Sequence, residues 1–462
     1  MSQPSIGTPW LLRVLIFASV IALATGAWFA RDTIGVRGQA FTGVLCFLGV
    51  AAACSVDLRR VSWRTVLTGL AIQVIIAVLI LRVPIVYKGF ELMGRLVAKF
   101  LDFANVGAEF VFGPLSKHDT SANAFGQNDA VIFAFRVLPT IIFVSAFFTV
   151  LYHLRVLQAI VWVFAKLMLL IFGRKGVSGA EALAASANVF MGQTEAPLII
   201  KPYVATMTKS ELLALMIGGM ATISGGLIAV YISFGADPVA ILATSVMAAP
   251  TGLYLSKLLW PETEEPVTRG KVKLAEERPH ANVIDAAAAG ASEGMKLAIN
   301  VAAMLIAFIA GIAMINFVLK AIGPEIGLPF LSLERTFAEV FSPFAFLMGV
   351  PPEDIQPVGE LLGKKLVLNE FVAFKEMTDT YAVKGEGGKF VGVHGMQERS
   401  YKLAVYALTG FANFASIGIQ LGGIGAMAPE RRKDLARLGL RALLGGFLAT
   451  LINASIAGIL MG

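Results

Sequence analysis

The chain has 462 residues, of which 57% are hydrophobic and 15% are charged, and its mean hydropathy is +0.76. Charged residues make up about 25% of a soluble globular protein, so the composition excludes that class and indicates a polytopic membrane protein. The net charge of +7 is better explained by basic residues in cytoplasmic loops than by nucleic-acid binding.

Runs of roughly 17–25 apolar residues, the length that crosses a bilayer, predict about nine transmembrane helices. These runs are 10–29, 39–56, 64–85, 131–153, 211–233, 238–257, 295–320, 402–424 and 438–460. The first run has no clear small-residue cleavage site after it, so we expect a retained helix and not a signal peptide. Cys46 and Cys54, in the second run, predict neither a disulfide framework nor a metal site.

Three further segments have a different pattern. Residues 87–105 carry charges at steps of three or four between apolar residues, which is typical of an amphipathic helix in the membrane interface. Residues 332–349 have the same pattern, and 155–173 are apolar but interrupted by Arg155 and Lys166. We expect all three segments to be interfacial helices.

Two glutamates lie inside apolar stretches among polar neighbours. Glu195 belongs to Asn-Val-Phe-Met-Gly-Gln-Thr-Glu-Ala-Pro at 188–197, and Glu370 to Leu-Val-Leu-Asn-Glu-Phe-Val-Ala-Phe at 366–374. An ionisable side chain at bilayer depth is costly and by default indicates a functional site. Gly and Pro near the first glutamate predict irregular backbone, which at that depth must be buried or line a cavity. We therefore expect two re-entrant hairpins.

Basic residues between the predicted spans set the orientation. Three clusters are expected in the cytoplasm: Arg59, Arg60 and Arg64; Arg174, Lys175, Lys201 and Lys209; and Arg431, Arg432, Lys433, Arg437 and Arg441. Alternation of the spans then places the N-terminus in the cytoplasm and the C-terminus outside. The first hairpin enters from the cytoplasm and the second from outside, which is the signature of an inverted repeat.

A weak sequence repeat supports this arrangement. Residues 219–226, Gly-Met-Ala-Thr-Ile-Ser-Gly-Gly, and 410–416, Gly-Phe-Ala-Asn-Phe-Ala-Ser, share Gly, a bulky apolar residue, Ala, and then Thr or Asn. Each follows a glutamate-bearing hairpin, and the glycines predict helices that unwind and free carbonyls for a cation. The alternative role for each glycine is tight helix packing in the membrane.

The predicted organisation has four parts. Residues 1–153 form scaffold helices with an extra N-terminal span, and 154–257 form the first transport repeat with its hairpin. Residues 258–330 form a cytoplasmic loop and a scaffold helix, and 331–462 form the second transport repeat. The fold class is therefore an all-α polytopic membrane protein with two opposed hairpins and interfacial helices.

If the hairpins and the unwound helices meet at the midplane, their side chains surround one site. The candidate groups are Gln193, Thr194, Glu195, Leu227, Glu370, Phe411, Asn413 and Ser416. Amide, hydroxyl and carboxylate groups beside a ring suit a neutral solute with hydroxyls and a flat face. Two carboxylates without a nearby arginine would repel a phosphate, so a nucleoside or a sugar-like molecule fits and a nucleotide does not.

A cation site is predicted beside the substrate. Asn188 and Thr222 offer side-chain oxygens, and the backbone near Met191 and Ile223 offers carbonyls. Hard oxygen ligands without thiolates or imidazoles favour an alkali cation over a transition metal. The alternatives are a capping role for Asn188 and a hydrogen bond from Thr222 back to its own helix.

Four motifs stand out together: Ala-Asn-Val-Phe-Met-Gly-Gln-Thr-Glu-Ala-Pro-Leu at 187–198, Met-Thr-Lys-Ser-Glu-Leu at 207–212, Lys-Leu-Val-Leu-Asn-Glu-Phe-Val-Ala at 365–373 and Gly-Phe-Ala-Asn-Phe-Ala-Ser-Ile at 410–417. These motifs resemble the concentrative nucleoside transporter family, with bacterial members the most similar. The resemblance extends from about residue 41 to the end. The span 10–29 is additional to the shortest bacterial members, and 385–399 has no clear counterpart.

The resemblance implies a homotrimer in which part of each protomer moves across the membrane as an elevator. In the family pattern, Gln193, Thr194 and Glu195 bind the nucleobase, with Leu227 packing nearby. Glu370, Asn413 and Ser416 hold the ribose, and Phe411 packs against the substrate. Asn188 and Thr222, with backbone oxygens of Met191 and Ile223, match the sodium site.

We therefore expect a sodium-coupled nucleoside importer in the plasma membrane, or the inner membrane of a Gram-negative bacterium. The expected coupling ion is sodium, with no organic cofactor and no nucleic-acid partner. A proton is the alternative ion, carried by Glu195 or Glu370 in a low-dielectric site. An intramembrane enzyme would use both glutamates as acid and base, but the sequence lacks a nucleophile, metal cluster or cofactor motif. A channel would not need two opposed hairpins around one site.

Overall fold

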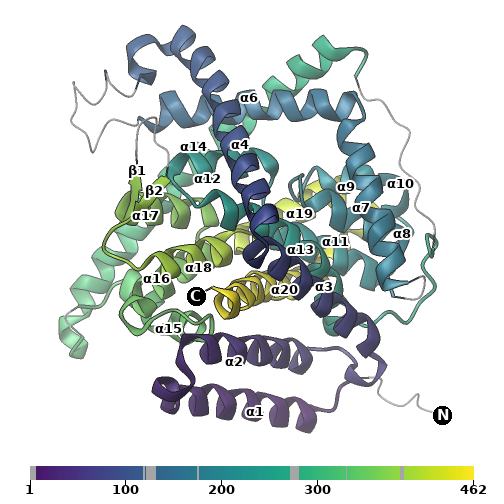
Figure 1. Cartoon of the computed structure of the whole chain (residues 1–462), viewed down its shortest axis with the longest axis vertical. Helices are drawn as coiled ribbons and strands as arrows, with labels where there is room; N and C mark the ends of the chain where they lie inside the picture. Colours follow the sequence, from purple (N-terminus) through teal and green to yellow (C-terminus); the bar gives the residue numbers. More distant parts are fainter. Residues whose placement is uncertain are drawn as a thin grey trace.

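The computed structural model describes residues 7–117, 120, 132–173, 176–270, 280–328, 330–384 and 390–461. Within these residues the fold is helical, with one small two-stranded sheet (Figure 1). Six segments are long and apolar enough to cross a membrane: Trp10–Phe29, Arg31–Ala53, Trp63–Arg82, Lys209–Phe234, Pro238–Leu259 and Pro429–Leu460. A seventh candidate is the pair Val137–His153 and Val156–Phe172, which is bent by 71°. The chain is therefore an all-α membrane protein with six to seven apolar spans in its described part.

The main elements of the fold are α-helices and two short strands. They are α1 (Trp10–Phe29), α2 (Arg31–Ala53), α3 (Trp63–Arg82), α4 (Pro84–Phe112), α6 (Phe133–His153), α7 (Val156–Phe172), α8 (Gly179–Asn188), α9 (Ala196–Ile199), α10 (Lys201–Val204), α11 (Lys209–Ala221), α12 (Gly225–Phe234), α13 (Pro238–Leu259), α14 (Val283–Ile322), α15 (Leu333–Leu347), α16 (Ile355–Val367), α17 (Glu370–Tyr381), β1 (Ala382–Lys384), β2 (Phe390–Val393), α18 (Glu398–Leu408), α19 (Phe414–Met427) and α20 (Arg432–Leu460).

The predicted number of nine spans is larger than the number found in the described part of the chain. The run 402–424 is two short helices, α18 and α19, because the backbone leaves the helical conformation between them. The run 295–320 is one part of the 40-residue α14, which begins in the segment predicted as a polar loop. Asn282 starts α14 by accepting a hydrogen bond from the Asp285 N–H at 2.9 Å. Hydropathy finds apolar runs, but it detects neither a break within a run nor a helix that continues past one.

The predicted interfacial segments are helices with shifted ends. The segment 87–105 lies within α4, which starts at Pro84 and ends before Gly113, a glycine with φ of 56°. The segments 155–173 and 332–349 correspond to α7 and α15. Arg155 separates α6 from α7 and is the one non-glycine residue with positive φ in the described part, at 62°. This costly backbone conformation makes the bend between the two helices.

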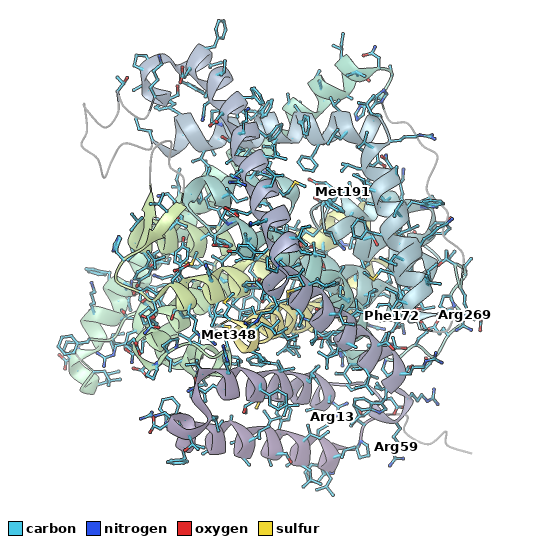
Figure 2. All side chains as sticks on the ribbon, in the orientation of Figure 1. Arg13, Arg59, Phe172, Met191, Arg269 and Met348 are labelled. Atoms are coloured by element: carbon cyan, nitrogen blue, oxygen red, sulfur yellow. The ribbon has the colours of Figure 1, made fainter. Side chains whose placement is uncertain are left out.

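The helices surround a core formed by α11, α13 and residues 442–458 of α20, whose side chains are nearly all buried. In Figure 1, α1 and α2 lie side by side at the lower edge, and α2 packs against α20 and α15. In α1, only Ala27 is buried in the described part, and Trp10, Ile21 and Phe29 are exposed, as expected for a helix that faces lipid. Arg13 ties α1 to the segment after α2 by donating to the Ser55 carbonyl oxygen at 2.9 Å (Figure 2).

A small β-hairpin follows α17 and was not predicted. Strands β1 and β2 are antiparallel, with Ala382 opposite Val393. They contain three and four residues, which is too short for an alternating pattern to be recognised in the sequence. Residues 385–389, between the strands, lie outside the described residues, as do Arg174 and Lys175 of the predicted basic clusters and residue 131 of the fourth predicted span.

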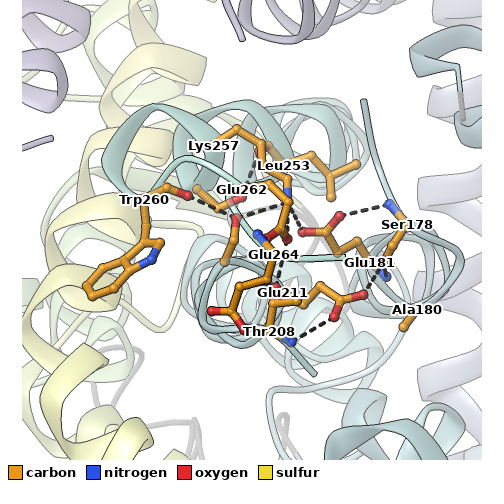
Figure 3. A network of polar contacts seen from close by, with 12 residues as sticks. Ser178, Ala180, Glu181, Thr208, Glu211, Leu253, Lys257, Trp260, Glu262 and Glu264 are labelled. Carbon is orange, nitrogen blue, oxygen red and sulfur yellow. Dashed lines mark hydrogen bonds and ion pairs between the residues drawn. The ribbon is translucent and has the colours of Figure 1, made fainter. Parts of the chain in front are cut away.

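Two capping boxes join the starts of α8 and α11 (Figure 3). Ser178 and Glu181 form the capping box of α8, and Thr208 and Glu211 form that of α11. The boxes contact each other, because Ser178 Oγ donates to Glu211 Oε1 at 2.5 Å. Each acidic side chain therefore satisfies the free N–H groups of one helix start and lies beside the other.

Lys257, near the end of α13, provides the cation of this network (Figure 3). Its Nζ lies 2.5 Å from Glu181 Oε1 and 3.5 Å from Glu262 Oε2, and it donates to Ser210 Oγ at 3.0 Å. The Lys257 and Glu181 side chains are 5% and 0% exposed. The network therefore fixes the start of α8 to the helices beside it.

Lys257→Met is expected to lower the thermal-unfolding midpoint of the detergent-solubilised protein markedly. The change leaves the Glu181 carboxylate buried without its cation, and breaking a buried ion pair in this way costs about 3–5 kcal/mol. The double variant Lys257→Met/Glu181→Gln removes both charges and is expected to recover part of the loss. A single variant that unfolds at the parent temperature would show that the pair contributes no stability.

Candidate functional site

The centre of the site is built on two interrupted helices. Residues 222–224 separate α11 from α12, and residues 409–413 separate α18 from α19. The two breaks contact each other, because the Phe411 N–H donates to the Thr222 carbonyl oxygen at 3.1 Å. Each break presents free carbonyls from one half-helix and free N–H groups from the next, and these groups are available to a bound solute or ion.

The half-helices that lead into the breaks end alike. Thr222 ends α11 and donates its hydroxyl to the Gly218 carbonyl oxygen at 2.9 Å. Thr409 ends α18 and donates to the Val405 carbonyl oxygen at 2.6 Å. The hydroxyl of Thr222 thus makes the bond back to its own helix that was one alternative from the sequence, and its oxygen keeps acceptor capacity.

The half-helices that leave the breaks also begin alike. Ser224 accepts from the Leu227 N–H at 3.4 Å, and Asn413 accepts from the Ser416 N–H at 2.9 Å. By position at the helix ends, Thr222 therefore corresponds to Thr409, and Ser224 corresponds to Asn413. The sequence match instead pairs Thr222 with Asn413, and that register is wrong because the second break is longer than the first.

Two helix–turn–helix units contact these breaks. The first runs from α8 through the turn 189–195 to α9 and α10, and the second runs from α16 through 368–369 to α17. Asn369 begins α17 by accepting from the Val372 N–H at 2.9 Å. Met191, in the first turn, lies in the region of α9 and α19 and away from the α1–α2 pair (Figures 1 and 2). The turns place Glu195 and Glu370 at corresponding positions, each at the start of the second arm.

Glu370 joins the second unit to both interrupted helices. Its carboxylate accepts from Asn413 Nδ2 at 2.9 Å and from the Tyr231 hydroxyl at 3.2 Å. All three side chains are buried, and Glu370 is 4% exposed. Tyr231 also stacks on the ring of Phe374, with centroids 4.2 Å apart.

Sequence reasoning missed Tyr231 as a site residue. It follows Leu227 by four positions on α12, and residues at this spacing lie on one face of a helix. The sequence did contain a signal for Tyr231: it lies in an apolar run, four residues after Leu227, which was expected to line the site. This tyrosine was not distinguished from the rest of the apolar run, because aromatic residues are common in membrane helices.

Gln193 joins the first unit to the second interrupted helix. Its Nε2 donates to Ser416 Oγ at 3.1 Å, and its buried Oε1 has no hydrogen-bond partner among the described residues. Thr194 and Glu195 are exposed, and Glu195 Oε2 accepts from the Gly192 N–H at 2.8 Å. The turn therefore presents one buried unsatisfied acceptor and two accessible polar side chains.

The two expected apolar walls lie at different depths. Leu227 is 7% exposed, on the first turn of α12, whereas Phe411 is half-buried in the second break. Of the eight candidate substrate residues, hydrogen bonds join Glu370 to Asn413, Asn413 to Ser416, and Ser416 to Gln193. In the described part of the chain, no hydrogen bond joins Thr194 or Glu195 directly to the Glu370 cluster.

Asn188 lies against the end of α11. It is 1% exposed, and neither atom of its amide has a partner among the described residues. Its Nδ2 lies 2.7 Å from the point that a Cβ on Gly218 would occupy. Met191, Thr222 and Ile223 are also buried. A buried amide without partners, beside a helix end that presents carbonyls, has the chemistry of an incomplete oxygen-ligand shell for a hard cation.

Three family models match the sequence. "Na+ dependent nucleoside transporter N-terminus" covers residues 42–115, "Nucleoside recognition" covers 134–238, and "Na+ dependent nucleoside transporter C-terminus" covers 240–458. Together they include both interrupted helices and both helix–turn–helix units.

Curated relatives match along almost the whole chain. Sodium/nucleoside cotransporter 1 of Mus musculus is 42% identical over 98% of this chain and 68% of its own length. Solute carrier family 28 member 3 of Homo sapiens is 38% identical over 98% of this chain and 64% of its own length.

Solved structures have the same fold. CNTnw in an inward-facing substrate-bound state is 38% identical with a TM-score of 0.84, covering 92% of this chain and 98% of its own. A variant of CNTnw in an outward-facing state is 37% identical with a TM-score of 0.84 and the same coverage. The chain therefore belongs to the concentrative nucleoside transporter family, a family of sodium-dependent nucleoside cotransporters and not of enzymes.

Proposed function

We propose that this sodium-dependent nucleoside cotransporter imports its substrate through a site formed where the two turns meet the two breaks. The observation that carries the proposal is the buried Glu370 carboxylate, which Tyr231 and Asn413 hold from different interrupted helices. A buried carboxylate in an apolar bundle is energetically costly, so its presence there indicates a function. Here its remaining acceptor capacity suits the hydroxyls of a ribose.

The other polar groups fit the two halves of a nucleoside. Asn413 contacts Glu370, Ser416 contacts Asn413, and both would hold the ribose with Glu370. The unsatisfied Gln193 Oε1, with Thr194 and Glu195, would bind the N–H and carbonyl groups of the base. A free base would leave the ribose-binding groups unpaired, which costs about 1–3 kcal/mol for each group. Leu227 and Phe411 would pack against the substrate as apolar walls.

Sodium would bind between the first turn and the end of α11. Asn188 and Thr222 would supply side-chain oxygens, and Met191 and Ile223 would supply backbone oxygens. Because Gln193 follows Met191 closely, an ion that fixes this turn would also order the base-binding side chains. Coupling then requires only that sodium favour the substrate-ready conformation.

Transport would follow alternating access of the elevator type. CNTnw has been solved in an inward-facing state, and variants of it in outward-facing and intermediate states, which supports such a cycle for a chain of the same fold. The proposed mobile parts are the two repeats, 154–257 and 331–462, with re-entrant hairpins that enter from opposite sides. The proposed scaffold is 1–153 with 258–330, in a plasma-membrane homotrimer whose N-terminus is cytoplasmic and whose C-terminus is outside.

Uptake of labelled uridine into proteoliposomes tests the proposed function. An inward sodium gradient is expected to drive accumulation above equilibrium, and potassium in place of sodium is expected to abolish it. Accumulation driven by a pH gradient and indifferent to sodium would replace sodium by a proton. Absence of uptake of uridine and of every competing nucleoside, from folded protein, would overturn the proposed substrate.

Tyr231→Phe tests the hydrogen bond that orients Glu370. We expect the uridine KM to rise by at least about 10-fold with the maximal rate mostly retained, because one hydrogen bond to a charged group contributes about 1.5–3 kcal/mol and every 1.4 kcal/mol is tenfold. The preference for uridine over 2′,3′-dideoxyuridine is expected to shrink, which a purely structural role would not produce. An unchanged preference, measured by competition in the uptake assay, would contradict the orienting role.

A further inference from the structure

Both interrupted helices present a helix C-terminus inside the apolar bundle. The last carbonyls of a helix have no partner within the helix, and they carry a partial negative charge. At bilayer depth such groups must be satisfied by the protein, by water or by an ion. The end of α11 at Thr222 and the end of α18 at Thr409 therefore both present partly negative carbonyl oxygens that need a partner.

At the end of α18 a lysine from the second helix–turn–helix unit supplies the positive charge. Lys365 Nζ donates to the Ala407 carbonyl oxygen at 2.6 Å and to Thr450 Oγ1 at 2.9 Å. The nitrogen also lies 5.6 Å from the ring centroid of Phe447, on the same helix as Thr450. Lys365 is 0% exposed, so this ammonium group has left water completely.

The partners of Lys365 differ from those of an ordinary buried lysine. Its neighbour Lys364 pairs with two carboxylates, those of Glu360 and Glu376. Within the described residues, no ion pair joins Lys365 to a carboxylate. Its ammonium is instead held by a carbonyl oxygen, a hydroxyl oxygen and an aromatic face, which are the groups that hold an alkali cation in a protein.

The two units correspond in place as well as in chemistry. Asn188 ends the first arm of the first unit and lies against α11, and Lys365 is near the end of the first arm of the second unit and contacts α18. The first contact has a buried amide with no partner, whereas the second has a covalently attached cation. The first break thus has unsatisfied polar groups that suit an ion, and at the second break a lysine nitrogen occupies the corresponding place.

We propose that the Lys365 ammonium is the resident counterpart of the coupling sodium ion. It holds the second unit on the end of α18, so this half of the site is assembled without an ion and only the first half responds to sodium. Lys365 is then a positioning residue, which fixes the arm that carries Glu370 while its ammonium contacts only protein groups. The inference rests on the proposed sodium site at Asn188.

Replacement of Lys365 tests whether the position needs a charge or only volume. Lys365→Ala leaves the two oxygen acceptors beside an empty space, and we expect uridine binding at saturating sodium to weaken by at least about 10-fold. Ethylammonium, which is smaller than the three carbons and the nitrogen that the substitution removes, is expected to restore binding, and the bulkier choline is not. Lys365→Arg is expected to bind better than Lys365→Met, although Met matches the length of lysine more closely.

The measurement is sodium-dependent uridine binding to detergent-solubilised protein, followed by uptake in proteoliposomes. Lys375→Met is the matched control, because Lys375 lies five residues after Glu370, as Lys365 lies five before it, and pairs with Asp379 on its own helix. The control is expected to bind uridine as the parent does. If Lys365→Ala is poorly folded, the same cations are compared by their effect on its thermal-unfolding midpoint.

The outcomes separate this inference from the proposed function. Lys365→Met with parental affinity and a parental sodium curve would overturn the inference, as would a Lys365→Ala protein that no small cation restores or stabilises. If the parent protein binds uridine equally well with and without sodium, the proposed coupling is overturned, whatever the Lys365 variants do. Selective recovery by ethylammonium, with sodium still required, would support both.

Discussion

Glu370→Gln is expected to lower sodium-driven uridine uptake by about 100-fold or more, because hydrogen bonds to a charged acceptor contribute about 1.5–3 kcal/mol each and a ribose offers two hydroxyls. The amide can still accept from Asn413 Nδ2 and donate to the Tyr231 hydroxyl, which are the two partners of the carboxylate in the parent. The variant should therefore fold while its affinity for ribose hydroxyls collapses. Uptake into proteoliposomes, with elution volume and thermal midpoint recorded in parallel, measures this.

Glu360→Gln is the matched control for this change. Glu360 lies on α16 of the same unit, is one of two carboxylates around Lys364, and is not part of the proposed site. We expect it to transport uridine at nearly the parental rate. Near-normal uptake by Glu370→Gln would remove Glu370 from ribose binding, and equal losses in both variants would point to general damage to this helix–turn–helix unit.

Asn188→Ala is expected to raise the sodium concentration for half-maximal uridine binding by about 10-fold or more, because an oxygen that faces a cation contributes about 1.5–3 kcal/mol. The parental amide has no protein partner in the described part of the chain, so its removal breaks no hydrogen bond there. Affinity for uridine at saturating sodium is expected to recover most of its parental value. A sodium curve that does not move would exclude Asn188 as a ligand.

Gly218→Ala should act in the same direction without removing a ligand. The new Cβ would lie 2.7 Å from Asn188 Nδ2, which is too close, so the amide must move. Gly418→Ala on α19 is the matched control, because nothing lies within 4 Å of its added Cβ. A raised sodium requirement in the first variant alone would show that the position of the Asn188 amide matters.

Many residues of the candidate site could be picked out in the sequence, because charged groups stand out in an apolar chain. Glu195 and Glu370 are recognised by the cost of a carboxylate at bilayer depth, and the glycines nearby by the freedom that an unwound helix needs. The structure shows interrupted helices at 222–224 and 409–413, in the two segments where the sequence predicts unwinding. The register between them was wrong, since a local match of residue types does not record how many residues a break contains.

The amino-acid sequence by itself determined the membrane class, the two acidic turns and the residues that belong to one family pattern. These follow from composition and from local chemistry, which distant parts of the chain do not change. The roles inferred for Tyr231 and Lys365 depend on the tertiary structure, which places each beside a partner from another part of the chain. A hydropathy profile counts Lys365 as an unfavourable charge within the membrane. Only the packing of Lys365 against the end of α18 shows that a carbonyl and a hydroxyl stabilise it there.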